Sequence, residues 1–169
     1  NIGAGGITNN GVLSINANQG TATTQIIMNT DATLAGTGTV DLNVGDPNGD
    51  LNDATLTTDL GVTGSIGEDQ SVSGKGIMGG VWINNGTINA NRVGQELRVA
   101  GDITQSANGT LRASGGTLGL ANGATVNRGL VTTDNGGIVT TTLFSATVGG
   151  GLHNLGDMGT NSGQLLAVG

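Results

Sequence analysis

The chain has 169 residues, of which 34 are Gly and one is Pro, none is Cys, aromatic residues make up 1%, and the formal net charge is -7. This length suffices for one domain with a buried core, while the lack of Cys excludes a disulfide framework. Five basic residues are too few to neutralise a nucleic-acid backbone, and no apolar run approaches the roughly 18 residues that membrane insertion needs.

Short stretches in which every second residue is apolar predict half-buried β-strands. In chain order they are VLSINA at 12–17, TVDLNV at 39–44, ELRVAG at 96–101, TLRA at 110–113 and TLGL at 117–120. The predicted inward residues are Leu13, Ile15, Ala17, Val40, Leu42, Val44, Leu97, Val99, Leu111, Ala113, Leu118 and Leu120. Arg98 and Arg112 take the alternate, outward positions. Such small aliphatic side chains suit a narrow core, whereas a sandwich or barrel usually holds several aromatic residues.

The stretch GDPNGDLNDATL at 45–56 interrupts this pattern. Asp46, Asn48, Asp50 and Asn52 occupy alternate positions, and Asp53 follows. Calcium loops of the EF type begin with this spacing, because Ca²⁺ takes about six to eight oxygen ligands that alternate residues can supply. The five residues therefore predict a calcium site.

The same stretch departs from a calcium loop at two positions. Leu51 stands where such loops have Gly, and Thr57 stands where they have a bidentate acid. Asp53 and Asp59 replace that acid only with altered geometry. The alternative is a solvated turn at a corner of the fold, in which Asp and Asn side chains cap backbone groups.

Trp82 lies in the stretch VWIN at 81–84. If Val81 and Ile83 point inward, alternation directs Trp82 outward, where a lone aromatic side chain predicts contact with a partner or a neighbouring subunit. In the alternative interpretation, Trp82 packs beneath a loop such as GEDQSVSG at 67–74.

Asn-Gly dipeptides recur along the chain, and NNGVLSINAN at 9–18 resembles NNGTINAN at 84–91. Their intervals predict a repeating unit of roughly 20–27 residues with two or three short strands, the size of one β-solenoid coil. We therefore predict a single all-β domain over 1–169, a right-handed parallel β-helix with Asn and Gly at corners that need φ > 0. A hairpin-rich barrel is the main alternative, because Asn-Gly also closes two-residue hairpins.

LAGTGTVDLN at 34–43, SGKGIMGGVWINNGTINAN at 73–91 and NGTLRASGGTLGLANGATV at 108–126 resemble the Gly- and Asn-rich repeats of bacterial secreted β-helix proteins. These include autotransporter passenger domains and filamentous-hemagglutinin-like adhesins. The resemblance covers about residues 9–145. It implies export, cell-surface display, adhesion and fibre-like scaffolds, and it carries over no catalytic residue.

Motifs for catalysis or for a regular ice-binding face are weak. The only His is His153, and no Gly-x-Ser-x-Gly elbow occurs, although Arg92, Arg98 and Arg112 could fall on neighbouring coils. Paired Thr residues at 21–23, 37–39, 55–57 and 140–142 recur at unequal intervals, which favours ordinary strand propensity over an ordered lattice.

The sequence thus predicts a non-catalytic, extracellular structural or adhesive protein of the bacterial surface. We expect it to self-associate into a filament by end-to-end stacking. Surface glycans are further expected partners, and calcium is the expected cofactor if the 45–56 loop binds a metal. The alternatives are a carbohydrate-binding or polysaccharide-cleaving β-helix module and an ice- or mineral-binding solenoid. Because the chain starts at Asn1 without Met and stops in mid-pattern, we expect it to be part of a longer, processed or polymerising protein.

Overall fold

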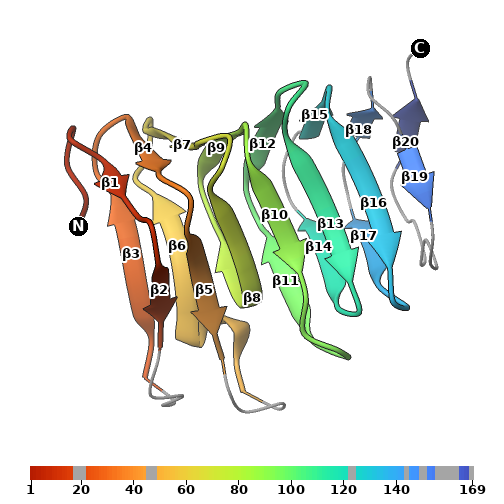
Figure 1. Cartoon of the computed structure of the whole chain (residues 1–169), viewed down its shortest axis with the longest axis horizontal. Helices are drawn as coiled ribbons and strands as arrows, with labels where there is room; N and C mark the ends of the chain where they lie inside the picture. Colours follow the sequence, from red (N-terminus) through yellow and green to blue (C-terminus); the bar gives the residue numbers. More distant parts are fainter. Residues whose placement is uncertain are drawn as a thin grey trace.

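The computed structural model describes residues 1–16, 22–44, 49–121, 125–142, 145–148, 152–154 and 164–167, and it describes side chains for 1–16, 22–44, 49–121 and 128–140. Within these residues the chain is all-β, with one 3₁₀ turn, η1 (Leu51–Asp53). No helix in the described part is long and apolar enough to cross a membrane. Figure 1 shows the strands following one another along the long axis of the molecule.

The described strands form two parallel sheets. The 8-stranded sheet has the order β1 (Ile7–Thr8), β4 (Ala32–Ala35), β7 (Thr63–Ile66), β9 (Val81–Asn84), β12 (Asp102–Gln105), β15 (Thr125–Asn127), β18 (Ser145–Val148) and β20 (Gln164–Ala167). The main path of the 12-stranded sheet has the order β17 (Ile138–Thr142), β14 (Thr117–Ala121), β11 (Glu96–Val99), β8 (Ser71–Met78), β10 (Thr87–Ala90), β13 (Thr110–Ser114), β16 (Leu130–Asp134) and β19 (Leu152–Asn154). Beside β8 it continues through β5 (Thr39–Asn43) to β2 (Val12–Ile15), and through β6 (Ala54–Thr58) to β3 (Thr24–Met28).

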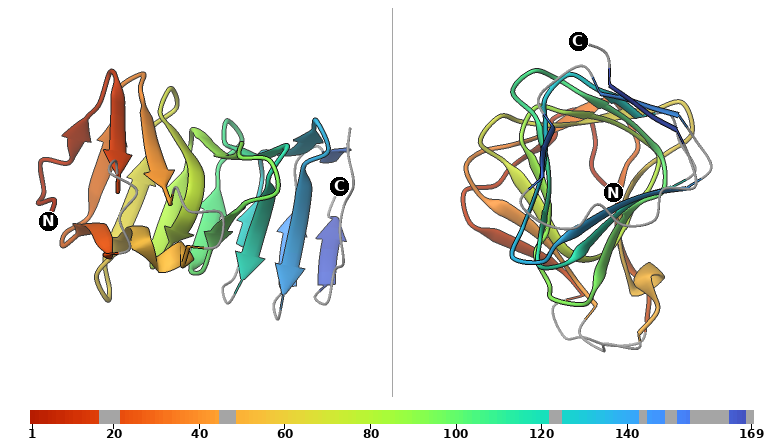
Figure 2. Two further views of the ribbon diagram at one scale, coloured as in Figure 1. Left: turned by 90° about the horizontal axis from the view of Figure 1, so that it is seen from below. Right: turned by 90° about the vertical axis from the view of Figure 1, so that its right-hand side faces the viewer.

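The chain runs repeatedly over three faces. Face I is the 8-stranded sheet, face II holds β2, β5, the first half of β8, β10, β13, β16 and β19, and face III holds β3, β6, the second half of β8, β11, β14 and β17. From β1 to β19 the strands follow in the order I, II, III, so each pass of the chain lies beside the preceding pass around a common core (Figure 2). β8 joins faces II and III because it bends at Gly74 and Gly76 without an intervening loop.

Every strand pairing among the described residues is parallel. A hairpin pairs two consecutive strands in antiparallel orientation. The hairpin-rich barrel is therefore wrong for this part of the chain.

The core consists of stacked aliphatic side chains. On face II, Val40, Val72, Ile88 and Leu111 are successive register partners, and each is 0% exposed. Burying each such side chain contributes roughly 1.5–3 kcal/mol. The predicted inward residues that the structure describes are buried, except for the partly buried Leu13. Ala17 lies outside the described residues.

The two NNG segments form corners between faces I and II. Nδ2 of the buried Asn84 donates to the carbonyl of Thr110 on the next pass (3.2 Å), and its Oδ1 accepts the amide N–H of Gly86 (3.1 Å). Asn9 likewise donates to β5 on the next pass and accepts the amide N–H of Gly11. The repeated motif thus hydrogen-bonds each of these corners to the pass that follows it.

Glycine at this corner is required by close approach of two passes. A Cβ at Gly86 would lie 2.2 Å from the carbonyl oxygen of Gln70, and a Cβ at Gly109 would lie 2.4 Å from that of Asn84. Neither glycine has positive φ, so the expectation of φ > 0 is wrong here. Among the described residues, positive φ is found elsewhere, at Asn16, Asn135, Gly6, Gly36, Gly61, Gly74, Gly76, Gly80, Gly94, Gly115 and Gly136.

Trp82 points into the core and is 0% exposed, whereas Val81 and Ile83 are 39% and 37% exposed. The predicted outward orientation, and with it the predicted role of Trp82 in an interface, is wrong. The register partner of Trp82 is Gly64, and a Cβ at Gly64 would lie 2.5 Å from the indole ring. The ring fills the space that Gly64 leaves, and its Nε1 donates to the carbonyl of Gly79 (2.6 Å).

Candidate functional site

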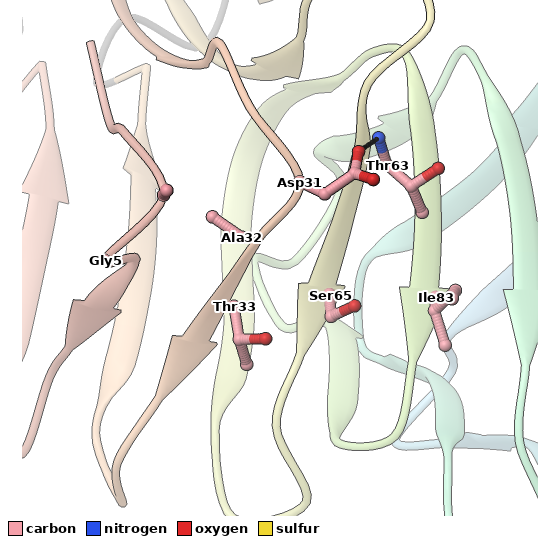
Figure 3. A pocket seen from close by; sticks show the side chains of 8 residues that line it. Gly5, Asp31, Ala32, Thr33, Thr63, Ser65 and Ile83 are labelled. Carbon is pink, nitrogen blue, oxygen red and sulfur yellow. Dashed lines mark hydrogen bonds between the residues drawn. The ribbon is translucent and has the colours of Figure 1, made fainter.

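An open groove of about 410 Å³ lies on the outer side of face I (Figure 3). It is lined by Asp31 just before β4, by Ala32 and Thr33 in β4, by Thr63 and Ser65 in β7, and by Ile83 in β9. Residues 4–5, which precede β1, complete the lining. Because these segments belong to successive passes, the groove crosses the strands.

Strand alternation places the groove side chains on the outside. Thr33, Ser65 and Ile83 are register partners on neighbouring strands, which lie about 4.8 Å apart. Their neighbours in sequence, such as Leu34 and Ile66, are buried in the core. The groove therefore contains one row of outward side chains, Thr33, Ser65 and Ile83, at the regular spacing of the strands.

Asp31 is the only carboxylate among the lining residues of the groove. Its Oδ1 accepts the amide N–H of Thr63 (2.8 Å), which fixes the orientation of the carboxylate (Figure 3). No Lys, Arg or His lines the groove. The site thus offers a carboxylate acceptor, three hydroxyls and the aliphatic surface of Ile83. Glycoside hydrolysis commonly uses two carboxylates, so this set of groups suits binding better than cleavage.

The structure describes only part of the predicted calcium loop. The carboxylate of Asp50 accepts the amide N–H of Asn52 (3.0 Å) and its side-chain Nδ2 (2.7 Å), and these bonds hold the pKa of Asp50 below its usual value. Asp53 is buried at the end of η1, while Asp46 and Asn48 lie outside the described residues. Among the residues that are described, no three His, Cys, Asp or Glu side chains gather in one place.

Three ion pairs lie on faces II and III: Asp41–Arg92, Glu96–Arg98 and Arg112–Asp134. Their side chains are 21–42% exposed, so each contributes at most about 1 kcal/mol. The three arginines that could have formed a cationic cluster each have a carboxylate partner. His153 lies in β19 beside Thr132, outside the residues whose side chains are described.

The pH dependence of stability is expected to include a contribution from Asp134. Hydrogen bonds from the Ser114 hydroxyl and the Arg112 guanidinium lower the pKa of Asp134. A carboxyl with a lowered folded-state pKa stabilises the fold above its unfolded pKa of about 3.9, and this stabilisation is lost as the pH falls through the folded value. We expect the urea midpoint to fall on acidification below about pH 4, and to fall less in Asp134→Asn.

Ser114→Ala removes the first of these hydrogen bonds and should weaken the pH dependence in the same direction. Urea titrations of the wild-type protein and both variants, in steps from neutral to acidic pH, measure the effect. The same acid-dependent change in all three proteins would contradict it.

Hydroxyl side chains form one column on face II. Thr39, Ser71, Thr87 and Thr110 are successive register partners, and the Thr39 and Ser71 hydroxyls are hydrogen-bonded at 2.7 Å. The adjacent outward column is mixed, with Asp41, Ser73, Asn89 and Arg112. A regular two-column hydroxyl lattice is therefore lacking on these described strands, which disfavours an ice-binding role for this face.

The described residues form an all-β fold of parallel sheets, with an open polar groove on face I. No known protein family, curated protein or solved structure matches the chain.

No motif in the sequence indicates the groove. Its hydroxyls stand at ordinary outward positions of short strands, and Asp31 stands in the bend before β4. Only the alternation in TLA at 33–35 and TGSI at 63–66 indicates which side chains face solvent, and alternation does not indicate which strands are neighbours.

Proposed function

We propose that the chain is a right-handed parallel β-helix that serves as a non-catalytic structural or adhesive part of an extracellular bacterial protein and assembles end to end into a filament. The observation that carries this proposal is the parallel stacking of successive passes, in the order face I, II, III, around a continuous aliphatic core. Right-handedness is supported by the strong preference of parallel β crossovers for that hand.

The non-catalytic role is supported by the chemistry of the described surface. The arginines of faces II and III are occupied in ion pairs, and the groove holds a single carboxylate. The extracellular location is supported by the resemblance of the repeats to those of secreted β-helix proteins and by the absence of Cys.

End-to-end assembly is supported by the first strand of face II. Among the described residues β2 pairs only with β5, so its other edge presents free backbone groups that can pair with another strand. The side chain of Val12 on this strand is 73% exposed. In the proposed filament, the last pass of a second copy covers this edge.

Electron microscopy of the purified chain tests the assembly. We expect unbranched filaments whose length increases with protein concentration. Val12→Lys places a charge at the strand edge, which blocks edge pairing, and should shorten the filaments. Leu60→Lys is the matched control, because Leu60 is fully exposed in the turn between β6 and β7. Dispersed monomers at high concentration, or equal effects of the two lysines, would contradict the proposal.

Carbohydrate binding is the second candidate function, and the groove on face I favours it. The absence of a second carboxylate in the groove favours binding over polysaccharide cleavage.

A further inference from the structure

We propose that the groove on face I binds an uncharged carbohydrate chain that lies across the strands. The inference rests on the proposed adhesive function and names its ligand class, but it does not depend on filament formation. Its basis is the combination of hydrogen-bonding groups, exposed aliphatic surface and charge in one open groove of about 410 Å³.

The hydrogen-bonding groups match a polyhydroxylated ligand. Asp31 is held by its bond to the Thr63 amide, and its second oxygen is free to accept from a ligand hydroxyl. The hydroxyls of Thr33, Thr63 and Ser65 both donate and accept. Hydrogen bonds to a charged acceptor are the stronger ones, so Asp31 is the main polar contact.

The register gives the groove a direction. Thr33, Ser65 and Ile83 lie on three neighbouring strands, so a linear ligand that runs across the strands meets one of these side chains about every 4.8 Å. A chain of similar sugar units suits such a repeated site better than a compact small molecule.

The aliphatic part of the site is exposed. Val81 and Ile83 alternate with the buried Trp82, and 39% and 37% of their surfaces remain accessible. They form a small apolar ridge on which the C–H face of a sugar ring can pack. Covering this ridge removes apolar surface from water, which favours binding.

Charge selects among possible ligands. The chain has a net charge of -7, and the groove holds Asp31 and no basic residue. Nucleic acids and acidic glycans are repelled from such a surface. A second copy docked by face I would bring the Asp31 carboxylate against the same carboxylate of its partner. An uncharged glycan is not repelled by this carboxylate, in contrast to an acidic polymer or a second copy of the chain.

Titration of the isotope-labelled protein with oligosaccharides, followed by amide NMR signals, tests the inference. The probes are the hexasaccharides of cellulose, xylan, mannan and amylose, with hexagalacturonate as the acidic comparison. We expect at least one uncharged probe to shift the Thr63 and Ser65 signals saturably, and hexagalacturonate to leave them unchanged. The inference is overturned if no uncharged probe shifts these signals or if the acidic probe binds as well.

Three variants locate the binding. Ser65→Leu fills the groove and should weaken binding at least tenfold. Asp31→Asn retains an acceptor for the Thr63 amide and should weaken binding about tenfold, as expected for loss of a charged hydrogen bond. Thr87→Leu is the matched control, an outward hydroxyl of face II in register with its neighbours, and should bind as the wild-type protein does.

Unchanged affinity in Ser65→Leu would overturn the assignment of the site. Filaments that form normally while glycan binding is absent would refute this inference alone. Glycan binding by a protein that stays monomeric would instead refute the proposed assembly and retain the groove.

Discussion

Replacing Trp82 with Ala is expected to lower the free energy of unfolding by about 3–5 kcal/mol, the usual cost of removing a large buried aromatic side chain. Trp82 is 0% exposed and is the largest of the fully buried side chains. Its ring occupies the space above Gly64, so truncation leaves a cavity that rigid neighbouring strands cannot close. The carbonyl of Gly79 also loses the indole donor.

Urea denaturation followed by far-ultraviolet circular dichroism measures this loss. Ile83→Ala is the control, because Ile83 follows Trp82 in β9 but is 37% exposed, and it should cost less than about 1 kcal/mol. Small, equal losses for the two variants would mean that Trp82 faces solvent.

Replacing Gly86 with Ala is expected to destabilise the protein by about 3 kcal/mol, at the upper end of the usual cost of inserting a methyl group into a packed site. The new Cβ would lie 2.2 Å from the carbonyl oxygen of Gln70 and 2.3 Å from that of Gly67. Both contacts are to backbone of the preceding pass, which cannot rotate away as a side chain would. The passes must therefore separate, which weakens the bond from the Thr87 amide to the Gln70 carbonyl.

Gly11→Ala is the matched control for this substitution. Gly11 ends the other NNG segment, and a Cβ there meets no atom within 4 Å. Since its φ is not positive, we expect a change within about 0.5 kcal/mol. Equal losses for the two substitutions, again from urea titrations, would show that local conformation, rather than stacking of passes, requires the glycine.

The strands were the most predictable part of this fold. Alternation correctly placed Val40, Leu97 and Leu111 in the core and Arg98 outside it, because side chains of a strand point alternately to its two faces. It failed at Trp82 because Val81, Trp82 and Ile83 are consecutive apolar residues, so alternation alone does not show which of them point inward. Which side of this strand faces the core depends on Gly64, which belongs to another pass.

The groove could not be predicted, because it depends on which strands are neighbours. On face II, Val40 pairs with Val72 and Val72 with Ile88, at intervals of 32 and 16 residues. The corners differ in length, so no constant period aligns the passes. Thr33 and Ser65 are likewise far apart in sequence but adjacent in the sheet.

The sequence by itself determined the β class, the inward aliphatic set and the use of Asn-Gly at corners, because these follow from local alternation and turn chemistry. Only the tertiary structure decided which strands are neighbours and in what register, the burial of Trp82, the close approach that requires Gly86, and the gathering of Asp31 with the face I hydroxyls. Each of these depends on contacts between passes that lie about 16 to 32 positions apart, and residues at such separations are brought together by packing alone.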